Sequence, residues 1–161
     1  MRMMMIAAAA LMSPVTAFAQ HDDHADTTGA VYDATRDADA DVAAALARAA
    51  TNGHMVMIIL GGNWCHDSRA LATHFADPEF QTMLRDRYEV VYVDVGHRDR
   101  NLHIPERYGA ATVAGTPTVL LLSPQGSLLN RGTAGSWRNA ASRSRRTIYA
   151  AFARFRPQPA R

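Results

Sequence analysis

The chain has 161 residues, of which 48% are hydrophobic, and this size and composition favour one domain with its own core. Its formal net charge is +2, all 17 basic residues are arginine, and residues 107–161 carry nine of them without an acidic residue. These arginines accompany no recognised nucleic-acid motif, and no segment after the leader approaches the roughly 20 apolar residues of a membrane span. We therefore expect neither a nucleic-acid partner nor stable membrane insertion.

The first nineteen residues have the pattern of a signal peptide. Arg2 supplies a positive start, residues 3–12 are apolar, and Ala17-Phe18-Ala19 is a small-x-small cleavage site. We expect cleavage after Ala19 and a periplasmic or secreted protein. The polar residues that follow, 20–30, are predicted to form a flexible acidic arm.

This arm contains the cluster His21-Asp22-Asp23-His24. Imidazole and carboxylate groups are copper and zinc ligands, so a weak metal site is one interpretation of the cluster. A flexible arm has no preformed coordination geometry, and a solvated tail is the alternative that we favour. The prediction is accordingly that His21 and His24 form no specific metal site.

The first elements of the domain follow the arm. Residues 39–50 are predicted to form a helix, and the continuous apolar run from His54 to Leu60 suits a strand that is buried on both faces. From Ser68 to Phe75 the spacing becomes helical, with Leu71 and Phe75 four residues apart on one face. A strand-to-helix turn therefore lies between residues 60 and 68.

Cys65, the only cysteine, lies in this turn. Unpaired N–H groups and the helix dipole favour an anion at a helix N-terminus, so a thiolate is stabilised there relative to a thiol. An exported protein also meets an oxidising compartment, where a single cysteine has no intramolecular partner. We interpret Cys65 as a reactive nucleophile; the alternative is an inert buried cysteine.

The neighbours of Cys65 have less certain roles. Protonated His66 could hold the thiolate or give a proton to a leaving thiol, or it could be an exposed residue of the first helical turn. Asp67 opposes a thiolate but favours the helix start. The pair Gly61-Gly62 leaves room for a partner's backbone to approach, or simply satisfies a turn.

Periodicity and turn residues predict the remaining elements, without an internal repeat. We interpret Arg143, Arg145 and Arg146 as the solvated side of the last helix rather than a docking patch. The predicted elements are a helical turn over 77–84, a strand over 89–95, a polar loop over 96–105, a short helix over 106–110, a hairpin of strands 118–122 and 127–130, and a last helix over 138–155 with Ile148, Phe152 and Phe155 facing inward.

Two motifs together resemble the thioredoxin superfamily: Trp64-Cys65-x-x-Ser68 after a buried strand, and Gly115-Thr116-Pro117-Thr118 about fifty residues later. The resemblance covers residues 31–156, and it implies an α/β thioredoxin fold, a central mixed sheet flanked by helices, here with an N-terminal helical extension; residues 157–161 would be a tail. The closer likeness, in Phe75 to Phe80 and Val90 to Asp94, is to secreted thioredoxin-like proteins and the anterior-gradient relatives of protein disulfide isomerase.

The resemblance also implies roles for these residues. Trp64, Thr116 and a cis-Pro117 would form the loop that receives an extended substrate segment. Ser68 stands where the family usually has its resolving cysteine, so release of a mixed disulfide would need glutathione, a client thiol or another protein. The expected function is monothiol exchange with cysteine-containing clients: isomerisation, deglutathionylation or capture. No cofactor is expected beyond glutathione as an external thiol.

Two other classes of function stay open. Ile59 occupies the position of the family's usual buried acid, and this departure leaves His66 or solvent to transfer protons. A thioredoxin-fold binding module, in which Cys65 only captures clients or forms a disulfide-linked dimer, is the alternative to an enzyme. A copper-handling protein is the third class.

Overall fold

The structure is a computed structural model that describes residues 30–156. The predicted signal peptide, the histidine cluster of the acidic arm and the predicted tail lie outside the described residues. The elements in chain order are α1 (Ala38–Asn52), β1 (Met55–Gly61), α2 (His66–Phe75), α3 (Pro78–Arg87), β2 (Tyr88–Asp94), α4 (His103–Arg107), β3 (Thr118–Leu122), the 3-10 helix η1 (Ala140–Ser142) and α5 (Arg145–Ala153).

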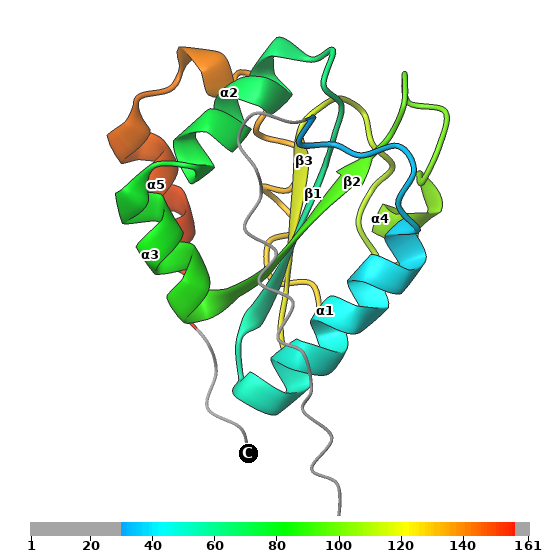
Figure 1. The fold of residues 1–161 in the computed structure, drawn as a ribbon, viewed down its shortest axis with the longest axis vertical. Coiled ribbons are helices and arrows are strands. Elements are labelled where there is room, and N and C mark those ends of the chain that lie inside the picture. The colour runs from blue at the N-terminus through cyan, green and yellow to red at the C-terminus, as the bar shows by residue number, and fades with distance from the viewer. Residues whose placement is uncertain (1–29, 157–161) are drawn as a thin grey trace, which may run out of the picture.

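The described strands form one mixed sheet in the order β2-β1-β3. β1 runs parallel to β2 and antiparallel to β3, with Ile58 opposite both Val91 and Leu120. All seven residues of β1 are buried, as its continuous apolar sequence predicts. Figure 1 shows α2, α3 and α5 on one side of the sheet and α1 and α4 on the other. This arrangement confirms the predicted fold class, including the helix before the first strand.

Alternate residues of β1 point to opposite faces, and the two faces have different cores. We call them the aromatic face, which α2, α3 and α5 cover, and the aliphatic face, which α1 and α4 cover. The aromatic face is built from Tyr32, Met55, Met57, Ile59, Leu71, Phe75, Phe80, Trp137, Ile148 and Phe152, among others. The aliphatic face is built from Val42, Ala45, Ala49, Val56, Ile58, Leu60, Ile104, Leu120 and Leu122, among others.

The predicted hairpin is wrong in its second strand. Residues 127–130 form no strand; a single bridge joins Leu122 to Leu128. The buried side chain of Asn130 takes over the edge of β3, because its Oδ1 accepts from Leu121 N at 2.8 Å and its Nδ2 donates to Val119 O at 2.8 Å. One side-chain amide thus satisfies backbone groups that a further strand would otherwise pair.

Two predicted helices have different bounds. The short helix spans 103–107 rather than 106–110, since Gly109 adopts a left-handed conformation with φ 69° that ends it. The last helix begins at Arg145, not residue 138, because Ser144 is extended and caps it by accepting from Thr147 N. Within α5, Ile148 and Phe152 are buried as predicted, whereas Phe155 follows the helix and is only half-buried.

Candidate functional site

Cys65 is the N-cap residue of α2. Three residues separate it from β1, and its backbone is extended (φ −82°, ψ 122°). Arg69 N then donates to its carbonyl oxygen at 3.1 Å to begin the helix. Its own N–H donates to Gly62 O at 3.0 Å. Its side chain makes no capping bond and is half-buried. The sulfur therefore lies at the start of the helix with one side open to solvent.

The proline loop lies directly against this sulfur. The thiol of Cys65 donates to the Thr116 carbonyl oxygen at an Sγ–O distance of 3.4 Å, although the two residues are 51 positions apart. The Thr116–Pro117 peptide bond is cis, and both residues are buried. The structure thus brings together three of the residues that the two sequence motifs single out.

Opposing effects act on the pKa of the Cys65 thiol. Burial raises it, because a covered thiolate loses hydration. The nearby hydroxyl groups of Ser68 and Thr116, which can donate to a thiolate, and the backbone N–H groups of Ser68 and Asp67 lower the pKa and together outweigh burial. The pKa is consequently below the ordinary value of a cysteine, which is the condition for a reactive thiol at neutral pH.

Trp64 is the predicted substrate-binding residue that stands furthest into solvent. Its side chain is 47% exposed, its ring stacks on His97 with centroids 5.2 Å apart, and its Nε1 donates to Gly96 O at 2.7 Å. The backbone bond and the stacked imidazole fix an apolar surface beside the thiol. No sequence pattern predicts this role for His97, because only the folded loop brings its imidazole against the indole.

The side chains of the two residues after Cys65 make no hydrogen bond with the thiol in the described structure. His66 is exposed, and its side chain has no hydrogen bond or ion pair within residues 30–156. The Asp67 carboxylate accepts from Ala141 N at 2.9 Å and so ties the start of α2 to η1. Ser68, in contrast, is fully buried under the loop. Of the two predicted modulators, His66 and Ser68, only Ser68 contributes to lowering the pKa of the thiol.

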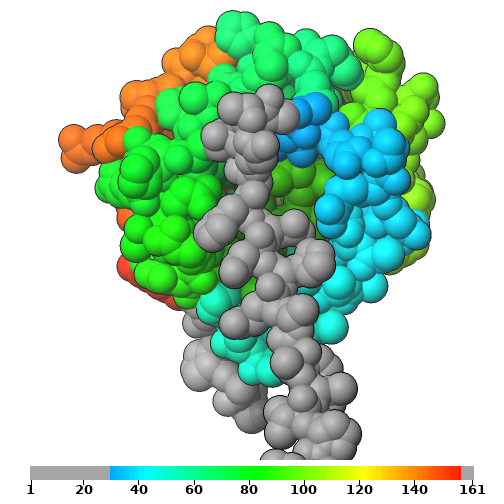
Figure 2. Space-filling view, viewed as in Figure 1, coloured from blue at the N-terminus to red at the C-terminus, as the bar shows by residue number. Residues whose placement is uncertain are grey.

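Tyr32 is a site residue that the sequence analysis missed. It precedes α1 and is 1% exposed, yet it packs beside the reactive loop rather than with α1. Asn63 holds it there: Tyr32 N donates to Asn63 Oδ1 at 3.1 Å, and Asn63 Nδ2 donates to Tyr32 O at 2.7 Å. Figure 2 shows the first described residues, in blue, next to the green start of α2. A tyrosine outside any periodic element carries no signal of such a contact.

Gly61 and Gly62 make room for side chains of this chain rather than for a partner's backbone. A methyl group on Gly61 would lie 2.6 Å from Tyr32 Cζ and 2.7 Å from Ser68 Oγ, and one on Gly62 would lie 2.6 Å from Trp64 Nε1. Neither glycine has a positive φ, so the turn itself does not demand them. The glycines are needed because the loop is packed closely.

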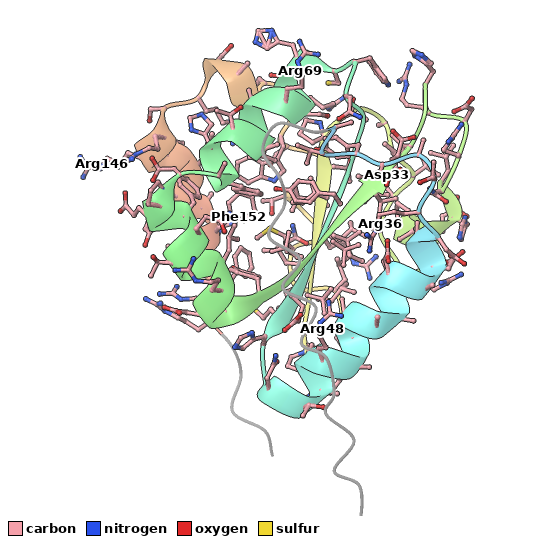
Figure 3. All side chains as sticks on the ribbon, viewed as in Figure 1. Asp33, Arg36, Arg48, Arg69, Arg146 and Phe152 are labelled. Atoms are coloured by element: carbon pink, nitrogen blue, oxygen red, sulfur yellow. The ribbon has the colours of Figure 1, made fainter. Side chains whose placement is uncertain are left out.

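Arginines line the outer edge of the same loop. Arg69 Nη1 donates to Asn63 O at 2.8 Å, and Figure 3 shows its side chain on the first part of α2. Arg98 Nη1 donates to Ala114 O at 3.4 Å. The side chain of Arg138 packs across Gly115, where an added methyl group would clash with it. These arginines brace the backbone on both sides of the thiol.

Neither a metal-binding cluster nor a membrane-spanning helix is found among residues 30–156. The described residues include no group of three or more histidine, cysteine, aspartate or glutamate side chains placed to hold a metal ion. No helix within residues 30–156 is long and apolar enough to cross a membrane. The histidine cluster at 21–24 is outside these residues, so its relation to metal stays a prediction.

Comparison with known proteins agrees with this geometry. Residues 37–124 match a family model described as thioredoxin-like. The chain is 33% identical to a structure described as a disulphide isomerase from Xylella fastidiosa Temecula1, with a TM-score of 0.71 over 76% of this chain and 93% of that one. It is 25% identical to a thioredoxin from Thermus thermophilus, with a TM-score of 0.51 over 69% and 80% of the two chains. No curated protein matches the sequence. With its cysteine-bearing helix start and the loop at Thr116, the chain belongs to the thioredoxin-like family.

Proposed function

We propose that this protein carries out monothiol thiol–disulfide exchange through Cys65. One observation carries the proposal: the thiol lies at the N-terminus of α2 against the Thr116 carbonyl, with a pKa below its ordinary value. A lowered pKa increases the thiolate fraction at neutral pH, and the thiolate is the nucleophile in exchange. The likeness to a disulphide isomerase supports the same chemistry.

The reaction begins with the Cys65 thiolate attacking one sulfur of a client disulfide. A bond forms between Cys65 Sγ and that sulfur, the client's S–S bond breaks, and the departing sulfur leaves as a thiolate that takes a proton from solvent. Loss of the thiol proton also frees the Thr116 carbonyl oxygen from its bond with the sulfur. That oxygen can then accept an N–H from an extended client segment, which is the pairing expected of a strand added at this loop.

The second step needs a thiol from outside the chain. Ser68 has a hydroxyl in place of a thiol, and Cys65 is the only cysteine in the sequence. If another cysteine of the client attacks the mixed disulfide, the client is isomerised with no net redox change. If glutathione attacks a glutathionylated Cys65, glutathione disulfide forms and the client leaves reduced. In each case Cys65 departs as a thiolate, ready for another cycle.

We further propose export to the periplasm or outside the cell, and membership in the branch that resembles secreted thioredoxin-like and anterior-gradient proteins. The support is the leader pattern of residues 1–19 and the run from Phe75 to Phe80. Sequencing the N-terminus of the exported protein tests the location. A mature chain beginning at Gln20 supports it, and retention of Met1 on the protein in the cytoplasm contradicts it.

The exchange activity is tested by turnover. The protein is incubated with a glutathionylated peptide and with scrambled ribonuclease, each in a glutathione buffer, and compared with Cys65→Ser and Ser68→Cys. We expect many turnovers per chain, loss of all of them in Cys65→Ser, and a gain of net dithiol oxidoreductase activity in Ser68→Cys. No more than one covalent event per chain would overturn the enzymatic proposal.

A binding module is the second candidate, and Ile59 is the observation that favours it. This residue is fully buried beneath the loop on the aromatic face, so no carboxylate occupies its position. A protein without a buried acid still captures clients by forming a mixed disulfide. In that case Cys65 would give stable client adducts or a disulfide-linked dimer, both visible on non-reducing gels and absent from Cys65→Ser.

A further inference from the structure

Two buried hydroxyl groups beside Cys65 have no hydrogen-bond partner in the described structure. Tyr32 is 1% exposed and Ser68 is 0% exposed, and neither Oη nor Oγ is paired. Buried polar groups are nearly always hydrogen-bonded, so each exception calls for an explanation. The two unpaired hydroxyls occur together next to the only thiol of the chain, which indicates that both act on this thiol.

Geometry places the two hydroxyls together. A single point, the position of a methyl group on Gly61, is 2.6 Å from Tyr32 Cζ and 2.7 Å from Ser68 Oγ. Since the phenolic oxygen is bonded to Cζ, the two hydroxyls share one small space. Ser68 lies one helical turn after Cys65, which brings its hydroxyl to the sulfur. The Ser68 hydroxyl therefore lies between the Tyr32 hydroxyl and the Cys65 sulfur.

The reactive loop is also built to hold Tyr32 in this place. Gly61 leaves the space that the phenol ring fills, and Asn63 clamps the tyrosine backbone with two hydrogen bonds. The ring packs edge-on against Tyr92 of β2 with centroids 5.5 Å apart. Contact with one tyrosine thus explains both Gly61 and Asn63, neither of which has a reactive group.

We propose that Tyr32 is a positioning residue that acts through Ser68 to stabilise the Cys65 thiolate. In the ionised state the Ser68 hydroxyl donates to Sγ, and the Tyr32 hydroxyl donates to Ser68 Oγ, so both orphan groups gain partners. The thiol proton leaves to solvent, and no proton crosses the chain of hydroxyls. The inference rests on the proposed function, because the thiolate is its reacting species.

Charge and burial around the pair agree with this role. Burial, followed by the neighbouring Tyr92, raises the pKa of Tyr32, so its phenol stays protonated and remains a donor. Asp67 is bonded to Ala141 N, and His66 is exposed and unpaired in the described structure. The arginines at the edge of the loop, Arg69, Arg98 and Arg138, each donate to a backbone carbonyl oxygen. The neutral hydroxyl of Tyr32 thus adds a hydrogen-bond donor to the backbone N–H groups that stabilise the thiolate at the start of α2.

The test is the thiol pKa, measured as the alkylation rate against pH in the whole protein. The variants are Tyr32→Phe, Ser68→Ala, the double variant, and Tyr92→Phe as a matched control that removes a neighbouring phenol. We expect Tyr32→Phe to lower alkylation at least about threefold at pH values below the thiol pKa, which corresponds to a pKa rise of about 0.5. We expect Ser68→Ala to lower it further, the double variant to match Ser68→Ala, and Tyr92→Phe to match the natural protein.

Non-additivity distinguishes this role from a loss of packing. A thiol pKa unchanged in Tyr32→Phe overturns the proposal. So does an effect of Tyr32→Phe that keeps its full size in the Ser68→Ala background, since the tyrosine would then act by another route. The phenylalanine retains the ring, and a thermal melt checks that each variant is folded.

The same data separate this inference from the proposed function. Alkylation needs no client, so a pKa that depends on Tyr32 in a protein without turnover supports the hydroxyl chain and removes the enzymatic proposal. Turnover by a protein whose thiol pKa is unchanged in Tyr32→Phe supports the enzymatic proposal and overturns the inference about the hydroxyl chain.

Discussion

The two faces of the sheet have equally buried cores but very different chemistry. On the aliphatic face, alanine and branched side chains of α1 and α4 meet alternate residues of β1, and nothing reactive lies among them. On the aromatic face, large rings pack beneath the helix that carries Cys65. Three of the four buried polar side-chain atoms without a partner in the described chain are on this side: Tyr32 Oη, Ser68 Oγ and Trp137 Nε1.

This difference shows how one small domain separates stability from reactivity. The aliphatic face gains from close packing of uniform groups, and a change there is expected to alter stability alone. The aromatic face accepts unpaired polar groups near the thiol, each of which costs stability when it stays unsatisfied. Variants paired across the two faces test whether the separation is real.

The largest effect is expected from Phe152→Ala. Phe152 lies between α5 and the sheet in Figure 3, stacks on Trp137 with centroids 4.5 Å apart and meets Phe75 of α2 edge-on at 5.2 Å. Loss of a buried phenylalanine costs about 3–5 kcal/mol. Leu122→Ala on the aliphatic face should cost about 2–5 kcal/mol. Urea unfolding measures both free energies.

The two variants should differ in the chemistry of the thiol. Phe75 connects Phe152 to the helix that begins at Cys65, so we expect the alkylation rate of the folded protein to change in Phe152→Ala and to stay the same in Leu122→Ala. Equal changes in both variants would show that the faces are coupled.

Two glycine-to-alanine changes sharpen the comparison. In Gly61→Ala the new methyl group meets the Tyr32 ring and Ser68 within 2.7 Å, and such overpacking costs about 1–3 kcal/mol. In Gly53→Ala, at the end of α1, nothing lies within 4 Å, but φ is 79°, which costs about 1–2 kcal/mol for a residue with a side chain. Thermal melts should show similar losses.

Only Gly61→Ala should disturb the thiol. Displacement of Tyr32 or Ser68 removes donors from the sulfur, so the Cys65 pKa should rise in this variant and remain lowered in Gly53→Ala. A rise in both variants, or in neither, would contradict the packing that we describe around Gly61.

The comparison also shows what the sequence could and could not predict. Continuous apolar strands and helical spacing are local signals, and they placed β1, β2 and α2 correctly to within a few residues. The cysteine at the start of α2 was visible for the same reason. Thr116 and Pro117 were predicted from resemblance to a family. No local pattern could show that they lie close to the sulfur.

The predictions that failed depended on single contacts over long distances. Asn130 takes the place of a strand because its side chain forms hydrogen bonds with the backbone of Val119 and Leu121. The short sequence after the turn gives no sign of whether it pairs as a strand or through one side chain. Tyr32 belongs to the site because Asn63, 31 residues later, holds its backbone. Such contacts have no periodicity, and only the folded chain reveals them.

Helix caps provide a smaller and more symmetrical test. Asp37 caps α1 by accepting from Ala40 N, and Ser144 caps α5 by accepting from Thr147 N. Replacement of either residue by alanine should cost about 0.5–2 kcal/mol in urea unfolding. Neither cap contacts the thiol, so the alkylation rate should match that of the natural protein in both variants. A change in either one would extend the site beyond the residues described above.

The smallest effect is the dependence of stability on pH above neutrality, and it should come from the thiol and the buried phenols of the aromatic face. The pKa of Cys65 is lowered in the folded state, so its contribution is present above the unfolded thiol pKa, about 8.5, and is lost as the pH falls through the folded value. Burial raises the pKa of Tyr32, Tyr88 and Tyr92, so their contributions are present below about pH 10 and are lost above it.

Unfolding free energy should therefore rise gently as the pH approaches 9 and fall beyond 10. Cys65→Ser removes the rise because no thiolate remains to be stabilised. Tyr32→Phe reduces the alkaline fall because one of three buried phenols is gone, and it also weakens the rise if that phenol supports the thiolate through Ser68. Urea titrations at closely spaced pH values measure both slopes. A Tyr32→Phe curve with a reduced fall but the full rise would place the tyrosine in the core and outside the site.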